Sequence, residues 1–132
     1  MIIVGCPGQG SQTEGFLIPW LEEVPKFENE LNKLATACEL DLVRLGTTAT
    51  EDEIKDTAIA QPLIVGASIA AFRSSFAQLK IHGVVGHSVG EFAAAAISGV
   101  LSDTDAISLV KTRGLAMARA AEASDTSMAA VL

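Results

Sequence analysis

Apolar residues follow one another without interruption in three short stretches of the chain. These are MIIVGC at residues 1–6, GVVG at 83–86 and SMAAVL at 127–132. Continuous apolarity over so few residues is typical of strands that are buried on both faces of a parallel sheet. We therefore expect strands at 1–6 and 83–86, and the beginning of another strand at 127–132. The polar, glycine-rich stretch that follows the first of them is expected to be a loop over 7–15.

Longer segments between these stretches show the 3.6-residue spacing of helices. Helices are expected at about 25–38, over a short acidic stretch after Thr50, and at about 61–78, 89–98 and 103–123. Thr50 and Glu53 form a capping box, and Ser102 is expected to cap the last helix. The helix over 61–78 is apolar on nearly every side, so it is expected to be deeply buried. Pro62 is expected in its first turn, where proline is tolerated.

Short strands separated by helices predict an α/β fold with a parallel sheet and helices on both of its faces. Only two convincing strands precede the last one, which is fewer than a parallel sheet usually has. The sequence also stops within an apolar run. Both features favour a piece of a larger domain. The alternative is a small compact α/β domain whose edge strand is C-terminal.

Composition narrows the classes of protein that fit. The chain has 132 residues, 49% of them hydrophobic, and a formal net charge of −7. This length predicts one domain, and the acidic balance argues against binding to nucleic acid or to an anionic membrane surface. No basic segment opens the chain and no apolar run reaches the roughly 18 residues of a membrane span. A cytoplasmic protein is expected.

Two cysteines, Cys6 and Cys38, are too few and too far apart to suggest a metal site or a disulfide framework. We therefore expect no metal site and no disulfide framework.

Candidate chemistry centres on the stretch Gly86-His87-Ser88-Val89-Gly90, which matches G-x-S-x-G between an expected strand and an expected helix. In such a turn the small residues let strand and helix approach, and the serine is held in a strained, exposed position. The N–H of Val89, at the start of the helix, could stabilise an oxyanion. The alternative is an ordinary turn in which Ser88 caps the helix.

A nucleophilic serine needs a base, and the chain has two histidines. His87 neighbours Ser88 in sequence, so its side chain leaves the turn in another direction. His82 precedes the strand and is expected at its far end, on the surface. Neither is a convincing base, which is a second reason to expect that the chain is incomplete.

Four pieces of sequence are informative together: PGQGSQ at 7–12, QP at 61–62, GHSVGE at 86–91, and Arg113 within KTRGLAMARA. In order and spacing they resemble the malonyl-CoA:acyl carrier protein transacylases and the acyltransferase domains of fatty acid and polyketide synthases. The resemblance spans the whole chain. The combination is specific, although each piece alone is not.

The resemblance implies that Ser88 is the acyl nucleophile and that the backbone N–H groups of Gln9 and Val89 form the oxyanion hole. It implies that the protein transfers malonyl from malonyl-CoA to the phosphopantetheine thiol of acyl carrier protein, in fatty acid biosynthesis. The intermediate would be a malonyl-serine. No cofactor is implied, and the complete protein is expected to be a monomer.

Arg113 is implied to bind the free carboxylate of the malonyl group. A planar guanidinium suits that task, because it can hold a carboxylate through two hydrogen bonds. Without the motif, a solvated helix residue would be the ordinary interpretation. His87 and Met117 would flank the acyl pocket, although Met117 could equally belong to the core. Gln61 would support the turn by hydrogen bonding.

Members of this family are about twice as long as this chain. They have a large α/β-hydrolase-like subdomain and a small ferredoxin-like one. Residues 1–124 are expected to belong to the large subdomain, and 125–132 to be the first strand of the small one. The catalytic histidine would lie in the part that is absent here. This chain alone is therefore expected to be inactive and poorly stable.

Two other functions remain open. A serine hydrolase or thioesterase of the α/β-hydrolase type shares the turn, and would hydrolyse the thioester faster than it transferred the acyl group. A non-catalytic module that binds carrier protein would fold alone, bind the carrier and take up no acyl group. The sequence does not distinguish malonyl from methylmalonyl as the preferred group.

Overall fold

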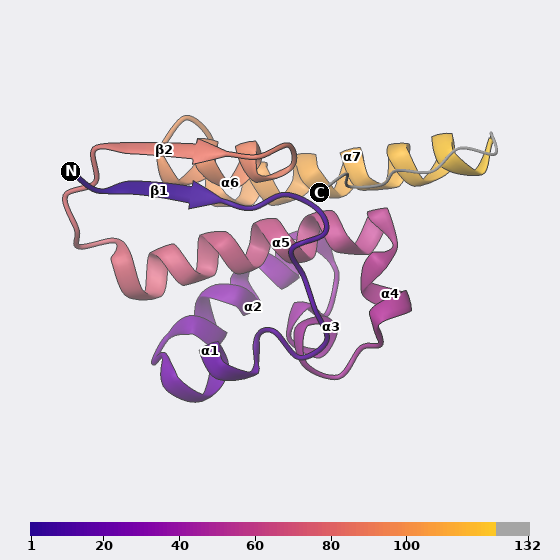
Figure 1. Cartoon of the computed structure of the whole chain (residues 1–132), viewed down its shortest axis with the longest axis horizontal. Coiled ribbons are helices and arrows are strands. Elements are labelled where there is room, and N and C mark those ends of the chain that lie inside the picture. The colour runs from indigo at the N-terminus through magenta and orange to yellow at the C-terminus, as the bar shows by residue number, and fades with distance from the viewer. Residues whose placement is uncertain (124–132) are drawn as a thin grey trace.

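The computed structural model describes residues 1–123, which form two strands and eight helical segments (Figure 1). In chain order they are β1 (Ile3–Cys6), α1 (Ile18–Glu23), α2 (Phe27–Cys38), α3 (Leu42–Thr47), α4 (Glu51–Lys55), α5 (Thr57–Ala71), the π-helical turn η1 (Phe72–Phe76), β2 (Gly83–Gly86), α6 (Gly90–Ile97) and α7 (Asp103–Glu122). The strand expected at 127–132 and the subdomain boundary expected after residue 124 lie outside the described residues.

The two expected strands are confirmed, and they pair in parallel. Ile3 lies opposite Gly83, and Cys6 lies opposite Gly86. Both strands therefore end at the same edge of the sheet. The glycine-rich loop after β1 and the serine-containing turn after β2 leave from that edge, so the pairing brings these two segments together.

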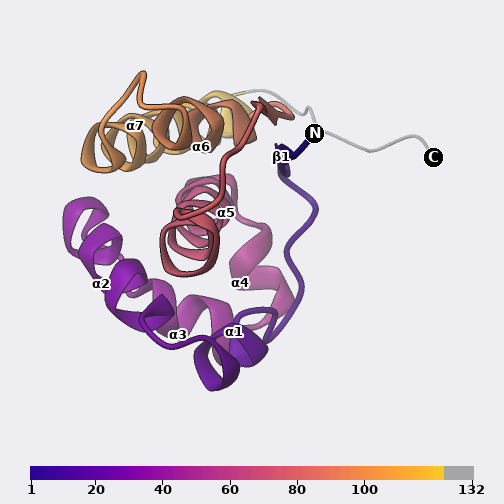
Figure 2. The same cartoon turned by 90° about the vertical axis from the view of Figure 1, so that its left-hand side faces the viewer.

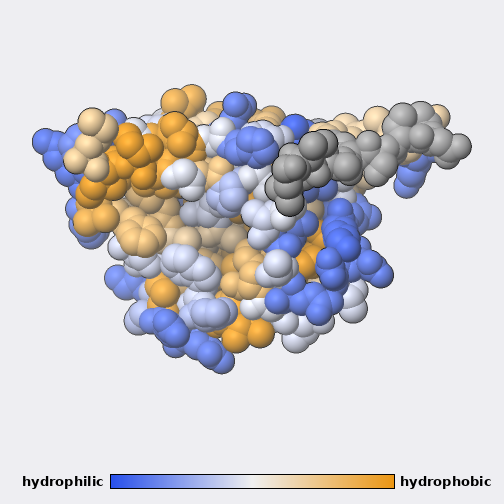
Figure 3. Space-filling model, in the orientation of Figure 1, coloured by the Kyte–Doolittle hydropathy of each residue, from blue (hydrophilic) through white to orange (hydrophobic). Residues whose placement is uncertain are grey.

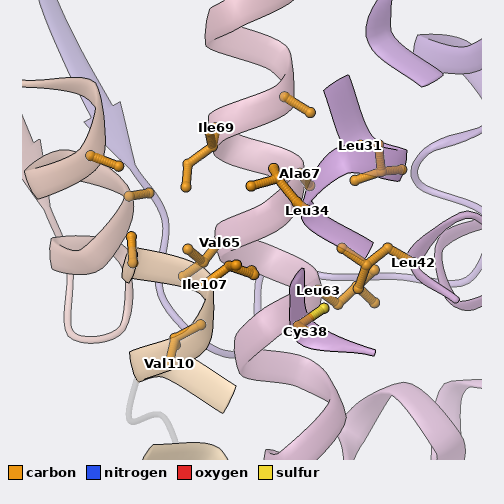
Figure 4. Close-up of a cluster of buried hydrophobic side chains, with 14 of the residues drawn as sticks. Leu31, Leu34, Cys38, Leu42, Leu63, Val65, Ala67, Ile69, Ile107 and Val110 are labelled. Atoms are coloured by element: carbon orange, nitrogen blue, oxygen red, sulfur yellow. The ribbon is translucent and has the colours of Figure 1, made fainter. Parts of the chain in front are cut away.

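The core is built around α5. Ten of its fifteen residues are buried, because α2, α6 and α7 all pack against it. Figure 4 shows the buried cluster, with side chains from α5 (Leu63, Val65, Ala67, Ile69), from α2 (Leu31, Leu34, Cys38), from α3 (Leu42) and from α7 (Ile107, Val110). The prediction of a deeply buried helix is confirmed, and the burial explains why this helix is apolar on nearly every side.

Residues Thr57–Phe76 also have the length and apolar composition of a membrane-spanning helix, with a mean hydropathy of 1.2. This segment is nevertheless 61% buried inside the protein. Packing against three other helices accounts for the same apolar composition.

One face of the sheet is bare among residues 1–123. α6 packs on the face that carries Val4 and Cys6, and Figure 2 shows α5, α6 and α7 on the same side of β1. Ile3 and Val85 lie on the other face and are 51% and 60% exposed. Figure 3 shows hydrophobic residues gathered at the end of the molecule where β1 begins. The prediction of helices on both faces is therefore not met within the described part of the chain.

The buried helix begins earlier than its sequence suggests. Its first residue is Thr57 rather than Gln61, because the Asp56 side chain accepts a hydrogen bond from the N–H of Ala58 at 2.8 Å and caps the helix there. Pro62 thus lies inside the helix, where it cannot donate to the carbonyl of Ala58. Regular helix also ends at Ala71, and one π-helical turn follows it.

The other expected helices are confirmed to within two residues at each end, and their caps are as expected. Thr50 accepts from the N–H of Glu53, and Ser102 accepts from the N–H of Asp105. Gly99 has a φ of 81° just after α6, which suits a glycine at a helix end. The helices α1 and α3 have only six residues each and did not stand out in the sequence.

Cys6 and Cys38 are both buried and free. Burial raises the pKa of each thiol, so both are held as neutral thiols rather than as reactive thiolates.

Candidate active site

The turn after β2 holds Ser88 in an unusual backbone conformation. Its φ is 52°, in the left-handed region that non-glycine residues rarely adopt. Such a conformation costs roughly 1–3 kcal/mol and persists only where the surrounding structure imposes it. The residue is also exposed. A strained, exposed serine between a strand and a helix is the geometry that G-x-S-x-G predicts.

The Ser88 side chain does not cap the following helix. Val89 occupies the N-cap position of α6, and no side chain there makes a capping hydrogen bond. Ser88 contributes only its backbone carbonyl, which accepts from the N–H of Glu91 at 3.1 Å. Within residues 1–123 its hydroxyl has no hydrogen-bond partner. The alternative interpretation as a capping serine is therefore not supported.

The serine turn and the loop after β1 touch through glycines. A Cβ at Gly90 would collide with the carbonyl oxygens of Cys6 and Pro7, and a Cβ at Gly8 would collide with His87. The N–H of His87 donates to the carbonyl of Cys6 at 3.0 Å. The two segments are therefore packed backbone to backbone, and glycine is needed where they meet.

Gly90→Ala is expected to lower the free energy of unfolding by about 1–3 kcal/mol, because the new methyl group meets two backbone carbonyls that cannot move aside easily. The matched control is Gly5→Ala, since a Cβ at Gly5 meets nothing within 4 Å. Denaturant unfolding of the full-length polypeptide that carries this sequence measures both. Equal stabilities of the two variants would show that the close approach is not required.

Two backbone N–H groups near this contact are uncommitted. Neither Gln9 nor Val89 donates its backbone N–H to an acceptor within the described residues. Val89 is at the start of α6, where the helix dipole favours negative charge. Backbone N–H groups without an acceptor are the kind of donor that an oxyanion needs.

A chain of side-chain amides leads from this loop to α7. The Gln9 amide donates to Thr57 Oγ1 at 3.2 Å, and Gln61 Nε2 donates to Gln9 Oε1 at 3.4 Å. Gln61 in turn accepts from Arg113 Nη1 at 2.6 Å, and its Nε2 lies 3.2 Å from Met117 Sδ. Four of the seven residues predicted for the site are therefore linked, because Gln9, Arg113 and Met117 each contact Gln61. The hydrogen bonds of Gln61 go to these partners and not to the serine turn.

Arg113 is half-buried, and its partner is a neutral amide. Arg44 and Arg73, by contrast, each bind a carboxylate, Glu53 and Asp103 respectively. Among residues 1–123, Arg113 forms no ion pair. A partly desolvated guanidinium without a counter-ion is suited to an anionic ligand.

His82 lies where the sequence predicts, on the surface and far from the serine turn. The N–H of Ile2 donates to His82 Nδ1 at 3.1 Å, so His82 is at the start of β1, the opposite end of the sheet from Ser88. The His87 side chain packs on Gly8 and is exposed. Neither histidine is hydrogen-bonded to Ser88 in the described part of the chain.

Two hollows lie near the sheet. A partly open cavity of about 320 Å³ lies between β1, α1, α5 and η1, and apolar side chains such as Trp20 and Phe72 line most of it. None of the seven predicted site residues lines this cavity. A shallower hollow lies at the strand ends, lined by residues 5–7 and 85–87, so it includes His87.

In the part of the chain described here, no three His, Cys, Asp or Glu side chains are grouped as a metal site would require.

Thr57 is the site residue that sequence reasoning missed. It fixes the Gln9 side chain, yet it stands at the first position of a helix whose start the sequence places four residues later. The Asp56-Thr57 pair was the available signal, because aspartate before a helix is a common cap.

Comparisons with known proteins show which family the sequence matches. The acyl transferase domain family matches residues 5–132. A malonyl CoA-acyl carrier protein transacylase of Mycobacterium tuberculosis is 49% identical over 136 residues, covering 100% of this chain and 45% of the relative.

Solved structures give the same result. The crystal structure of the Mycobacterium tuberculosis enzyme has a TM-score of 0.81 at 49% identity, over 93% of this chain and 42% of that one. A malonyl-transacylase in complex with a type II polyketide synthase acyl-carrier protein has a TM-score of 0.81 at 30% identity, over 90% of this chain and 39% of that one.

The chain thus spans less than half the length of the relatives it matches. Its helix-rich fold with a small parallel sheet is that of the structural neighbours. Two of the motifs that resemble acyltransferases, PGQGSQ and GHSVGE, lie where the two strands end side by side. The chain belongs to the acyl transferase domain family.

Proposed function

We propose that the protein to which this chain belongs transfers a malonyl group from malonyl-CoA to the phosphopantetheine thiol of an acyl carrier protein, in fatty acid biosynthesis. The observation that carries the proposal is Ser88, which is exposed, has a strained backbone at φ 52° and has a hydroxyl that does not cap the following helix. The malonyl transacylase relatives support the choice of acyl group and acceptor.

The reaction would have two halves. In the first, Ser88 Oγ attacks the thioester carbonyl of malonyl-CoA, the C–S bond breaks, and the hydroxyl proton passes to the leaving coenzyme A thiolate. In the second, the carrier thiol attacks the malonyl-serine ester and the proton returns to Ser88. Both halves pass through a tetrahedral oxyanion, for which the free N–H groups of Gln9 and Val89 are the candidate donors.

Arg113 would recognise the malonyl carboxylate. Its guanidinium is bound only to the neutral Gln61 amide within the described residues, so its positive charge remains available. Since an acetyl group offers a methyl group in place of the carboxylate, it would leave this charge unpaired. Met117 and His87 are proposed to border the acyl group.

The general base would come from outside residues 1–123, because neither His82 nor His87 reaches Ser88 within them. The α/β-hydrolase-like large subdomain and ferredoxin-like small subdomain belong to the same proposal. The small subdomain would begin beyond the described residues.

The test is to incubate the full-length polypeptide with malonyl-CoA in the presence and absence of phosphopantetheinylated acyl carrier protein. We expect malonyl-carrier to form much faster than free malonate. Free malonate as the main product even with carrier present would indicate a thioesterase. Carrier binding without any acyl transfer would indicate a non-catalytic module.

A further inference from the structure

We propose that Gln61 is a positioning residue that sets Arg113 for the substrate carboxylate and ties it to the loop that carries Gln9. This inference rests on the proposed function, because it assigns a role within the same site. It differs from the sequence-based expectation, in which Gln61 supports the serine turn.

Gln61 is deeply buried. Its side chain is 1% exposed, and it is the only buried polar or charged side chain among residues 1–123. A buried amide is costly unless its donors and acceptor are used, and all of them point toward site residues here. Its oxygen meets Arg113, and its nitrogen meets Gln9 and Met117.

The directions of these hydrogen bonds fix the orientation of the Gln61 amide. A guanidinium can only donate, so Arg113 fixes the oxygen of Gln61 toward itself and the NH₂ group toward the Gln9 loop. Arg113 uses only Nη1 for this contact within the described residues. The amide therefore orients the guanidinium through one nitrogen and leaves its other donors for a carboxylate.

The Gln61 side chain is neutral, so it binds Arg113 without cancelling its positive charge. A glutamate at position 61 would have nearly the same shape, but it would neutralise Arg113 and place a negative charge beside the incoming malonyl carboxylate. An amide binds the guanidinium without competing for its charge. This explains why the arginine is paired with a glutamine, whereas Arg44 and Arg73 are paired with carboxylates.

Gln61 also bonds to the Gln9 side chain. Gln9 accepts from Gln61 at 3.4 Å and donates to Thr57 Oγ1 at 3.2 Å, so its side chain is held from two positions on α5. The same residue carries one of the uncommitted backbone N–H groups. Gln61 thus joins the carboxylate-binding group and a candidate oxyanion donor through one buried side chain.

Helix packing holds the arrangement in place. α5 and α7 form the most extensive contact between elements in the described chain. Next to Arg113, a Cβ at Gly114 would lie 2.9 Å from the carbonyl oxygen of Thr57. The absence of a side chain at Gly114 lets α7 approach the first turn of α5, which brings Arg113 within reach of Gln61.

The experiment compares Gln61→Glu and Gln61→Met with the unchanged full-length polypeptide, using malonyl-CoA and acetyl-CoA as alternative donors to carrier protein. Lys111→Gln is the control, because it removes a surface ion pair with Glu39 from α7, the helix that carries Arg113. Thermal unfolding of every variant checks that the fold is retained.

We expect Gln61→Glu to raise the KM for malonyl-CoA by roughly 100-fold while changing the KM for acetyl-CoA little, since only malonyl carries a charge. Gln61→Met is expected to lower the malonyl-to-acetyl preference by roughly 10-fold. An equal loss with both donors in both variants would overturn the proposal. So would an unchanged preference in Gln61→Glu.

Failure of the proposed function would look different. In that case the unchanged protein would transfer no malonyl group at all.

If Gln61→Glu does not fold, Gln9→Ala provides the second test. Loosening the Gln9 loop is expected to lower kcat for both donors by roughly 10-fold and to leave their KM values unchanged. No change in kcat would contradict the link between Gln61 and the loop.

Discussion

Replacing Ser88 with alanine is expected to lower the rate of malonyl transfer by roughly 10⁴-fold or more, because no other group in the turn can form the acyl-enzyme. Nothing else about the turn should change, since the hydroxyl makes no hydrogen bond within residues 1–123. The measurement is the steady-state rate of malonyl-carrier formation by the full-length polypeptide.

Ser98→Ala is the control for this variant. Ser98 follows α6 at its other end and its hydroxyl bonds only the carbonyl of Ala95, so its loss should leave the rate unchanged. Ser88→Gly is informative as well. It should be as inactive as Ser88→Ala, yet more stable by about 1 kcal/mol, because glycine adopts φ 52° without strain. Transfer at an undiminished rate in Ser88→Ala would rule out Ser88 as the nucleophile.

Arg113→Ala is expected to lower kcat/KM for malonyl-CoA by roughly 100-fold or more, and to leave acetyl-CoA nearly unaffected. In the proposed mechanism the guanidinium binds the malonyl carboxylate. Without it, the carboxylate would be partly desolvated and would have no charged partner. Arg113→Lys should recover only part of the preference, since an ammonium cannot form the paired hydrogen bonds of a guanidinium.

The control for Arg113→Ala is Arg119→Ala, which removes the same charge from an exposed position of the same helix. Its kinetics should match those of the unchanged protein. The measurement is the ratio of kcat/KM values for the two donors. An equal fall in both values for Arg113→Ala would mean that the arginine supports the fold rather than selecting the substrate.

The sequence predicts much of this site because its elements are local. The serine turn is recognisable from the glycines on both sides of Ser88, and its strained φ follows from the same pattern. The caps at Thr50 and Ser102 depend on residues three positions apart, so they too are visible without a structure.

Features that depend on contacts between distant segments were harder to predict. Pro62 suggests that a helix begins there. The helix instead begins at Thr57, because Asp56 caps it and its first turn packs against α7. Gln61 has no local feature that marks it as the link between Gln9 and Arg113, because that role arises only where α5 and α7 cross. Both faces of the sheet are apolar in sequence, so the pattern could not show that one is bare among residues 1–123.

Mass spectrometry of the intact full-length polypeptide, before and after exposure to malonyl-CoA without carrier protein, would show whether Ser88 forms an acyl-enzyme. We expect the mass to rise by one malonyl group, the added mass to map to the peptide that contains Ser88, and the group to leave when carrier protein is supplied. An unmodified protein, or a malonyl group attached elsewhere, would contradict the proposed mechanism.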